Sequence, residues 1–292
     1  MMNDFFDMHT APLRIGKVHL KVRQLETVAA FYVSALGLAR IACGSGRITL
    51  GTETVPLLEL VGDPGLMAND RRQAGLFHTA FLMPSRADLA RWLSHAVANG
   101  VPLQGASDHI VSEAIYLADP EGNGIEVYVD RPMAHWHDQT GAIRMSSDPL
   151  DAQDLLKAAE GTQWVGFPVG GMIGHVHLQV GDTTEADRFY RDILGFDIAT
   201  RYPGASFYGS GGYHHQLAGN VWNSRRVGKR PEGMGGLDAV EIRVRDAASL
   251  AAIVKRAESA ALEISTDRGG MTLHDPWRTA ITLKNERQAD AS

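Results

Sequence analysis

Hydrophobic and polar residues alternate along several stretches of the chain in the manner of half-buried β-strands. In residues 175–180, Val176, Leu178 and Val180 alternate with two histidines and a glutamine. Because successive side chains of a strand point to opposite faces, one face of this strand is expected to pack in a core. The other face, which carries the histidines, is expected to look into a polar space.

A helical stretch follows this strand. Apolar residues between 189 and 194 recur at helical spacing, Thr183 or Thr184 is the expected N-cap, and Gly195 is the expected end. Shorter strands separated by Gly-rich turns come next, as in FYGSGGYHHQLAGN at residues 207–220. The order βαβββ, with one helix among antiparallel strands, predicts the α+β class.

The unit is repeated along the chain. VHLKVRQLETVAAFYVSALGL (residues 18–38) aligns without a gap on VHLQVGDTTEADRFYRDILGF (residues 176–196). A weaker repeat aligns GLFHTAFLMPSRADLARWL, from residue 75, on GLDAVEIRVRDAASLAAIV, from residue 236, and both copies end in an Asp-Pro turn. We therefore predict four βαβββ modules, at residues 14–62, 75–130, 173–223 and 235–285. They form two tandem domains, 14–130 and 173–285, with residues 131–172 as the connector.

Composition fits a globular chain. The 292 residues are 44% hydrophobic and 21% charged. No uninterrupted apolar run approaches the roughly 18 residues that a membrane span needs, and the first fifteen residues have no apolar core. A cytoplasmic protein without a membrane partner is expected.

Charge and cysteine content narrow the chemistry. The net charge is −6 and no segment gathers a basic cluster, so a nucleic-acid partner is not expected. Cys43 is the only cysteine in the sequence, which excludes intramolecular disulfides and clusters of thiolate ligands. A metal would have to bind nitrogen and oxygen atoms, and the chain has twelve histidines to offer.

Three residues that can bind a metal occur in one copy of each repeat and not in the other. At matched positions His175 stands against Lys17, His78 against Ala239, and Glu126 against Thr282. Two neutral imidazoles and one carboxylate form the facial triad of non-haem Fe(II) sites, which leaves three octahedral positions for substrate and O₂. A single histidine on a strand is more often structural, but three at corresponding strand positions favour a metal site.

The distribution of these residues also predicts which modules meet. Pairing the first module with the second, or the third with the fourth, leaves every site short of ligands. Only a pairing of the second module with the third brings His78 and Glu126 to His175. The site is therefore expected at the contact between the two halves of the chain, a common location for small-molecule pockets.

The chain resembles the vicinal oxygen chelate superfamily, which includes glyoxalases, bleomycin resistance proteins and extradiol dioxygenases. The resemblance covers roughly residues 14–285 and rests on the βαβββ repeats, GHVHLQV, GLFHTAF and DPEGNGIEVY. Within the superfamily it is to two-domain catechol 2,3-dioxygenase-like proteins. It implies His78, Glu126 and His175 as metal ligands and Fe(II) as the cofactor. The larger extradiol enzymes place the ligand modules in the opposite order along the chain.

The resemblance also implies catalytic residues. YHHQLAG is similar to the strand that carries the family's acid/base histidine, which falls on His215, and DHIVSEAIYLADPEGNGIE places a histidine and a tyrosine at His109 and Tyr116. An imidazole with an ordinary pKa near 6.5 suits His215 for taking a proton from a catechol. Tyr116 could hydrogen-bond a substrate oxygen. His109 lies closer to Tyr116 than in the archetypal enzymes, which leaves its role open.

The implied activity is cleavage of a small aromatic diol by O₂ beside its hydroxyl groups, and two other functions stay open. A glyoxalase-type isomerase or lyase usually needs a fourth protein ligand, often a carboxylate, and residues 213–220 contain none. A metal-free drug-binding protein of the bleomycin-resistance type would explain the fold but not the triad. The substrate, the metal in the cell, a homo-oligomeric state and a site shared between subunits are not determined by the sequence.

Overall fold

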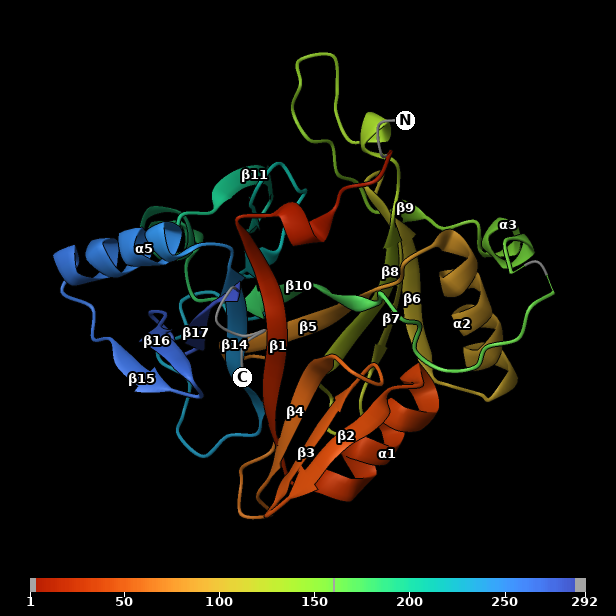
Figure 1. Cartoon of the computed structure of the whole chain (residues 1–292), viewed down its shortest axis with the longest axis horizontal. Coiled ribbons are helices and arrows are strands. Elements are labelled where there is room, and N and C mark those ends of the chain that lie inside the picture. Colours follow the sequence, from red (N-terminus) through yellow and green to blue (C-terminus); the bar gives the residue numbers. More distant parts are fainter. Residues whose placement is uncertain (1–3, 160, 287–292) are drawn as a thin grey trace.

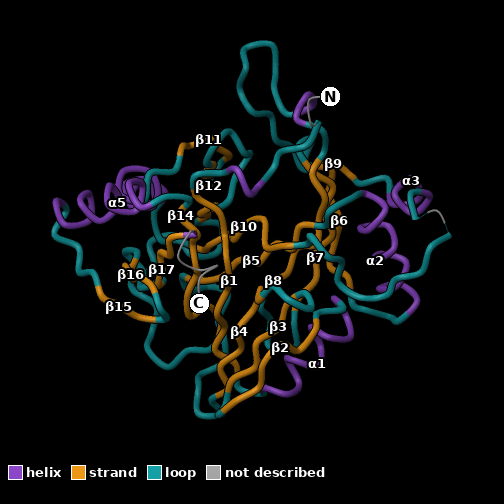
Figure 2. Tube along the Cα trace, in the orientation of Figure 1, coloured by secondary structure: helices purple, strands orange, loops and turns teal. Residues whose placement is uncertain are grey.

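The computed structural model describes residues 4–159 and 161–286, whose strands form two curled sheets with helices along their outer sides (Figures 1 and 2). The first module contains β1 (Leu13–Val22), α1 (Leu25–Leu36), β2 (Ala39–Gly44), β3 (Arg47–Gly51) and β4 (Pro56–Gly62). The second contains β5 (Gly75–Leu82), α2 (Arg86–Ala98), β6 (Leu103–Asp108), β7 (Ser112–Ala118) and β8 (Gly124–Asp130).

The second half of the chain repeats this order. The third module contains β10 (Met172–Gln179), α4 (Thr183–Asp187), the π-helix η3 (Arg188–Ile193), β11 (Asp197–Tyr202), β12 (Ala205–Gly209) and β13 (Leu217–Asn220). The fourth contains β14 (Gly236–Val244), α5 (Ala247–Ser259), β15 (Ser265–Asp267), β16 (Gly270–His274) and β17 (Ala280–Asn285). The predicted α+β class, built from βαβββ modules, is confirmed.

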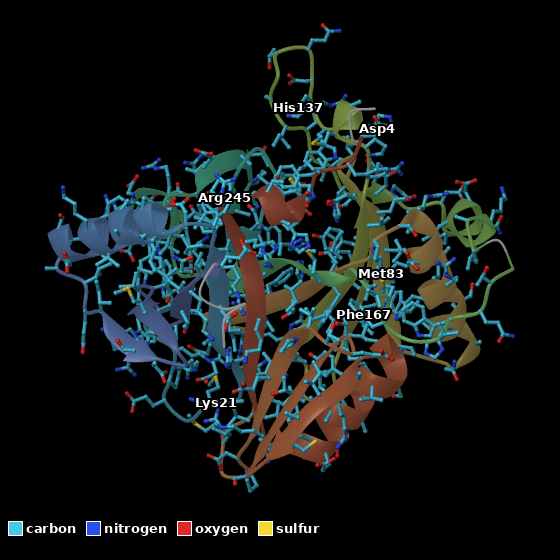
Figure 3. The ribbon with its side chains drawn as sticks, in the orientation of Figure 1. Asp4, Lys21, Met83, His137, Phe167 and Arg245 are labelled. Atoms are coloured by element: carbon cyan, nitrogen blue, oxygen red, sulfur yellow. The ribbon has the colours of Figure 1, made fainter. Side chains whose placement is uncertain are left out.

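Short elements lie outside the modules. The 3₁₀-helix η1 (Met8–Thr10) precedes the first module, and the connector contains η2 (Met133–His135), β9 (Asp148–Pro149) and α3 (Ala152–Lys157). Figure 3 places His137 on a connector loop that projects from the body of the molecule, where its side chain is exposed. No helix within the described residues combines the length and apolar character needed to cross a bilayer.

The modules pair across the connector. Among the described residues, one sheet has the strand order β11-β12-β13-β10-β5-β8-β7-β6-β9 and so joins the second module to the third. The other, β15-β16-β17-β14-β1-β4-β3-β2, joins the first module to the fourth. The predicted pairing of the second and third modules is confirmed. Each sheet thus takes one module from each half of the chain, while the division into domains 14–130 and 173–285 stays a prediction.

The two faces of β10 have different roles, as the alternation of its residues predicts. Val176 and Leu178 of β10 are buried in one hydrophobic cluster with Val18 and Leu20 of β1, whose strand contacts β10 across the two sheets. His175, on the opposite face of β10, lines a pocket. Burial of the apolar face fixes the register of β10, because a shift of one residue would turn its histidines into the core.

One predicted helix cap is wrong. The cap of α4 is Asp182, whose side chain accepts hydrogen bonds from the backbone N–H groups of Thr184 and Glu185. The helix therefore begins at Thr183. An ionised carboxylate at the N-cap satisfies two otherwise unpaired N–H groups and interacts favourably with the helix dipole. The expected end holds, since Gly195 adopts the left-handed backbone conformation typical of helix ends, with φ of 90°.

Candidate metal centre

Three neighbouring strands, β8, β5 and β10, carry the three predicted ligands. In the parallel pair β5–β8, Ala80 lies opposite Glu126, and in the antiparallel pair β5–β10 the same Ala80 lies opposite His175. His78 is two residues before Ala80 and shares its face of the strand. The small side chain of Ala80 leaves the space between the three larger ones open.

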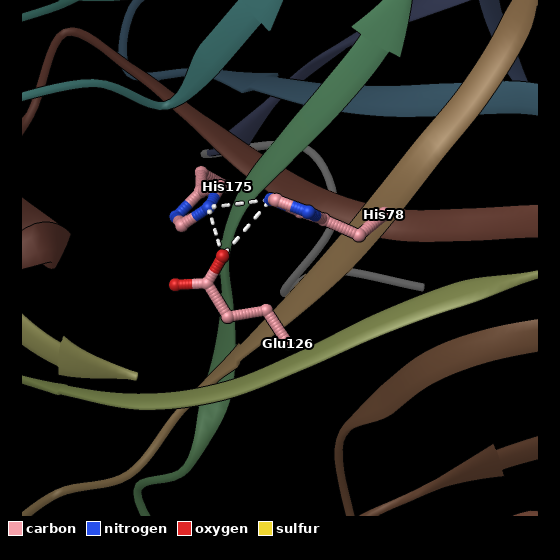
Figure 4. Close-up of side chains that lie close together, drawn as sticks. All are labelled: His78, Glu126 and His175. Carbon is pink, nitrogen blue, oxygen red and sulfur yellow. Dashed lines mark hydrogen bonds and ion pairs between the residues drawn. The ribbon is translucent and has the colours of Figure 1, made fainter. Parts of the chain in front are cut away.

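The ligand atoms form a tight triangle (Figure 4). His78 Nε2 lies 2.9 Å from Glu126 Oε2, His175 Nε2 lies 3.3 Å from the same oxygen, and the two Nε2 atoms are 3.3 Å apart. All three residues are buried, with side chains no more than 8% exposed. Within the described part of the chain, these three side chains bring one potential ligand atom each to within 4.8 Å of one another, close enough to hold one metal ion.

Ligand spacing fits a single ion. Metal–ligand bonds of about 2.1 Å place neighbouring ligand atoms about 3.0 Å apart in an octahedron and about 3.4 Å apart in a tetrahedron. The observed separations of 2.9 to 3.3 Å lie within about 0.1 Å of this range. Nitrogen and carboxylate oxygen suit Fe(II), Mn(II) and Zn(II) alike, so the ligand set fits a divalent ion without choosing among them.

The electrostatics of the triangle favour a cation. Burial alone would raise the pKa of Glu126, but the charges of His175 and His78, together with their hydrogen bonds, hold it well below its usual range. Burial lowers the pKa of His175 to about 4, against the opposing attraction of Glu126. At neutral pH the site thus offers an ionised carboxylate and an imidazole with a free lone pair, both removed from water.

Close packing fixes the backbone of β10 beside this triangle. Gly174 precedes His175, and a Cβ atom at this glycine would lie 1.8 Å from the hydroxyl oxygen of Tyr128. A side chain here would therefore displace Tyr128, whose ring also packs against His175. The close contact with Tyr128 explains why the GHVHLQV segment begins with a glycine.

A pocket of about 220 Å³ opens over the three residues. One wall is aromatic: the ring centroid of Phe77 is 5.4 Å from that of Trp222 and 4.9 Å from that of His177, while Phe207 lies 5.7 Å from His177. Flat rings at these separations provide an apolar slot that suits a planar aromatic ligand.

The three predicted catalytic residues line the same pocket. The ring of His215 lies 4.2 Å from that of His175. Tyr116, on β7, lies opposite Glu126 of β8. His109, in the turn before β7, places Nε2 2.6 Å from the Tyr116 hydroxyl, and its Nδ1 lies 2.5 Å from the backbone oxygen of Ser146 in the connector. The sequence left the role of His109 open, and the structure places it in contact with Tyr116.

Burial changes the acid–base character of these groups. It lowers the pKa of His215 well below 6.5, and the nearby His175 and His214 lower it further. The expectation of an ordinary pKa for His215 is therefore wrong, since the fully buried ring is neutral across the physiological range. Burial and the Glu126 charge raise the pKa of Tyr116 well above 10, so its hydroxyl keeps its proton.

The matching region of the other sheet is occupied by ion pairs. Lys17 Nζ lies 2.9 Å from Glu59 Oε2, and Arg47 lies 2.8 Å from the other oxygen of the same carboxylate. Thr282 Oγ1 lies 3.0 Å from Thr272 Oγ1, in the place of the Glu126–Tyr116 pair. A larger cavity of about 670 Å³ opens beside this sheet, where Asp238 is paired with Lys21 and Arg268.

Several pocket residues escaped the sequence analysis. Phe77, Phe207 and Trp222 line the pocket but carry no catalytic group that a sequence motif would show. Ala80 is a small residue in a strand and gives no signal. His214 does not line the pocket but contacts His215 behind it, and the adjacent pair of histidines was a signal available in the sequence.

Comparison with known proteins identifies the family. The family model described as the Glyoxalase/Bleomycin resistance protein/Dioxygenase superfamily matches residues 14–127 and 172–276. The chain is 34% identical over 267 residues to the catechol-2,3-dioxygenase of Bacillus subtilis (strain 168), across 90% of this chain and 93% of that protein. The chain belongs to this superfamily, as its repeats led us to expect, and is a catechol 2,3-dioxygenase-like member of it.

Two further comparisons give one sequence relative and one structure of similar fold. Biphenyl-2,3-diol 1,2-dioxygenase 3 of Rhodococcus globerulus is 29% identical over 161 residues, across 51% of this chain and 85% of that protein. Glyoxalase I from Zea mays superposes with a TM-score of 0.60 at 15% identity, covering 98% of this chain and 97% of that one. The second likeness, at this identity, concerns the fold alone.

Proposed function

We propose that the chain is an extradiol ring-cleaving dioxygenase that uses Fe(II) and O₂ to open a catechol-type aromatic diol beside its hydroxyl groups. The observation that carries the proposal is the buried triangle of His78, Glu126 and His175 beneath an aromatic-walled pocket. It occurs in a chain similar over nearly its whole length to a catechol-2,3-dioxygenase.

The metal and the pocket residues would make different contributions to the reaction. An Fe(II) ion on three protein ligands would supply the redox chemistry that lets O₂ react with an aromatic diol, with coordination positions left for both. The rest of the pocket binds and orients the substrate. Phe77, Phe207 and Trp222 would enclose the ring of the diol, and their apolar surface excludes water from the site.

Three pocket residues would bind or move the protons of the substrate hydroxyl groups. His215, neutral because it is buried, has a lone pair available to accept the proton of a substrate hydroxyl. Tyr116 is protonated at working pH, and its hydrogen points to Nε2 of His109, whose Nδ1 donates to the backbone oxygen of Ser146. Its phenolic oxygen would accept a hydrogen bond from a substrate hydroxyl and hold it over the ligand triangle. His109, 2.6 Å from the Tyr116 hydroxyl, would orient that hydroxyl.

The experiment begins with protein purified without oxygen. We expect it to retain iron and, once catechol and O₂ are supplied, to consume O₂ in step with the appearance of a ring-opened product. Replacement of His78, His175 or Glu126 by Ala should each abolish iron retention, because loss of one ligand of three exceeds the roughly 10 to 100-fold effect of an outer-sphere change.

Other outcomes decide against the proposal. Tightly bound Zn(II) with isomerase or lyase activity and no O₂ consumption would favour a glyoxalase-type enzyme. Absence of any retained metal, with binding of an apolar drug, would favour a sequestering protein. The exposed His135 provides the control, since His135→Ala should leave iron content and turnover unchanged.

A further inference from the structure

A line of hydrogen bonds leads from the pocket into the protein. His215 Nδ1 lies 2.9 Å from Nδ1 of His214, and Nε2 of His214 lies 2.9 Å from Oδ1 of Asp130. Tyr213 donates its hydroxyl to the same carboxylate oxygen at 3.0 Å. His214 is completely buried, and His215 and Asp130 are no more than 8% exposed.

Packing holds the middle of this line in place. The ring of His214 lies 4.0 Å from that of Tyr213 and 4.9 Å from that of Trp136. Asp130 ends β8, the strand that also carries Glu126, and alternation puts both carboxylates on one face of that strand. The same strand therefore positions a metal ligand at one point and the end of the hydrogen-bonded line four residues later.

Donor and acceptor rules fix the protons along the line. An ionised carboxylate only accepts, so the nitrogen of His214 that faces Asp130 must carry its hydrogen. In a neutral imidazole the other nitrogen then has the lone pair, which for His214 is Nδ1. The hydrogen between the two histidines must consequently belong to Nδ1 of His215, and its Nε2 is left with the lone pair.

We propose that Asp130 and His214 are positioning residues that hold His215 in its Nδ1–H tautomer and present the Nε2 lone pair to the pocket. The inference rests on the proposed function only in giving His215 a role toward the substrate. The tautomer matters because a substrate hydroxyl can hand its proton only to a ring nitrogen that has a lone pair. In many proteins a second hydrogen-bonding residue fixes the tautomer and the orientation of a functional histidine.

The tautomer can be observed without turnover. Long-range ¹H–¹⁵N correlation spectra of the full-length, metal-free protein labelled with ¹⁵N-histidine distinguish a hydrogen on Nδ1 from one on Nε2. The signals of His215 are identified by their loss in His215→Gln. We expect the hydrogen on Nδ1, and a hydrogen on Nε2 would overturn the proposal even if the enzyme proves to be a dioxygenase.

Two variants at His214 separate positioning from packing. His214→Phe keeps a ring but removes the acceptor, so His215 should populate both tautomers and kcat should fall by about 10 to 100-fold, with KM and iron content unchanged. His214→Asn offers an amide oxygen near the position of Nδ1 and should keep the tautomer, with kcat within about tenfold of the wild type. Unchanged tautomer and kcat in His214→Phe would contradict the proposal.

Tyr213→Phe is the matched control. It removes the other hydrogen bond to Asp130 and leaves the line from Asp130 to His215 intact, so the tautomer should not change. If the wild-type protein shows the expected tautomer but cleaves no catechol, the proposed function fails while the assignment of positioning stands.

Discussion

At the scale of single residues, His215 and the ligand triangle have separable roles. His215→Gln removes the basic nitrogen but none of the converging ligand atoms, so iron and catechol should still bind. We expect kcat to fall by roughly 10² to 10⁴, the usual contribution of a positioned acid or base. Steady-state kinetics with parallel iron analysis measure the effect, and His135→Gln, at an exposed position, is the control. Loss of iron from His215→Gln would instead make His215 a ligand.

The repeat made the candidate ligands predictable from sequence, because His78, Glu126 and His175 stand where the other copies carry Ala, Thr and Lys. Their chemistry is a property of the residue type and needs no neighbours. The neutrality of His215 could not be predicted in this way, since it arises mainly from burial in the folded chain and from His175, which is 40 residues away in the sequence. The same holds for Phe77, whose role depends on the rings around it.

At the scale of elements, the two sheets have diverged in what they can bind. In the sheet of the first and fourth modules, Lys17 is paired with Glu59. The matching region of the other sheet holds the candidate ligands His78, Glu126 and His175. A lysine already paired with a carboxylate fills that space with its own positive charge, so a divalent cation is disfavoured there. We expect one equivalent of tightly bound metal per chain, and none in His78→Ala, by elemental analysis. Two equivalents in the wild type would contradict this assignment.

The Asp-Pro turn of the fourth module has a measurable pH signature. Burial raises the pKa of Asp275 from 3.8 to about 6, despite hydrogen bonds from Tyr190 and from the backbone N–H groups of Trp277 and Thr279. Because the raised value favours the protonated form in the folded state, its stabilising contribution is complete below pH 4. It is lost as the pH rises through about 6.

Asp275→Asn tests this turn. The amide oxygen can still accept the two backbone hydrogen bonds but does not ionise, so the free energy of unfolding should not decline between pH 4 and pH 6.5 through this residue. The wild type should lose up to about 3 kcal/mol more than the variant over that interval. Urea unfolding of both proteins across this range measures the difference, and parallel pH curves would refute the assignment.

At the scale of the whole molecule, local pattern and long-range pairing were predictable for different reasons. Strand alternation and helix spacing are local, and they predicted four βαβββ modules, which the structure contains as β1–β4, β5–β8, β10–β13 and β14–β17. Which modules meet is not a local property. The pairing of the second and third modules was predictable only because three candidate ligands had to converge. The pairing of the first and fourth modules, β1 with β14, was not predicted, because no candidate site required those modules to meet. The cap at Asp182 was not predicted, because Asp and Thr both favour the N-cap position and the sequence pattern does not choose between neighbouring residues.

The interleaved sheets lead to a prediction about where the site belongs. His78 on β5 and His175 on β10 lie on paired strands of one chain, so the candidate ligand set is complete within each molecule. Chains that carry His78→Ala and chains that carry His175→Ala should then remain inactive when coexpressed with different tags and isolated together. A mixture of wild type with the double variant should keep the activity of its wild-type chains and serves as the control. If β10 were instead exchanged between two copies, some mixed sites would be whole, and recovered turnover with recovered iron would place the site between subunits.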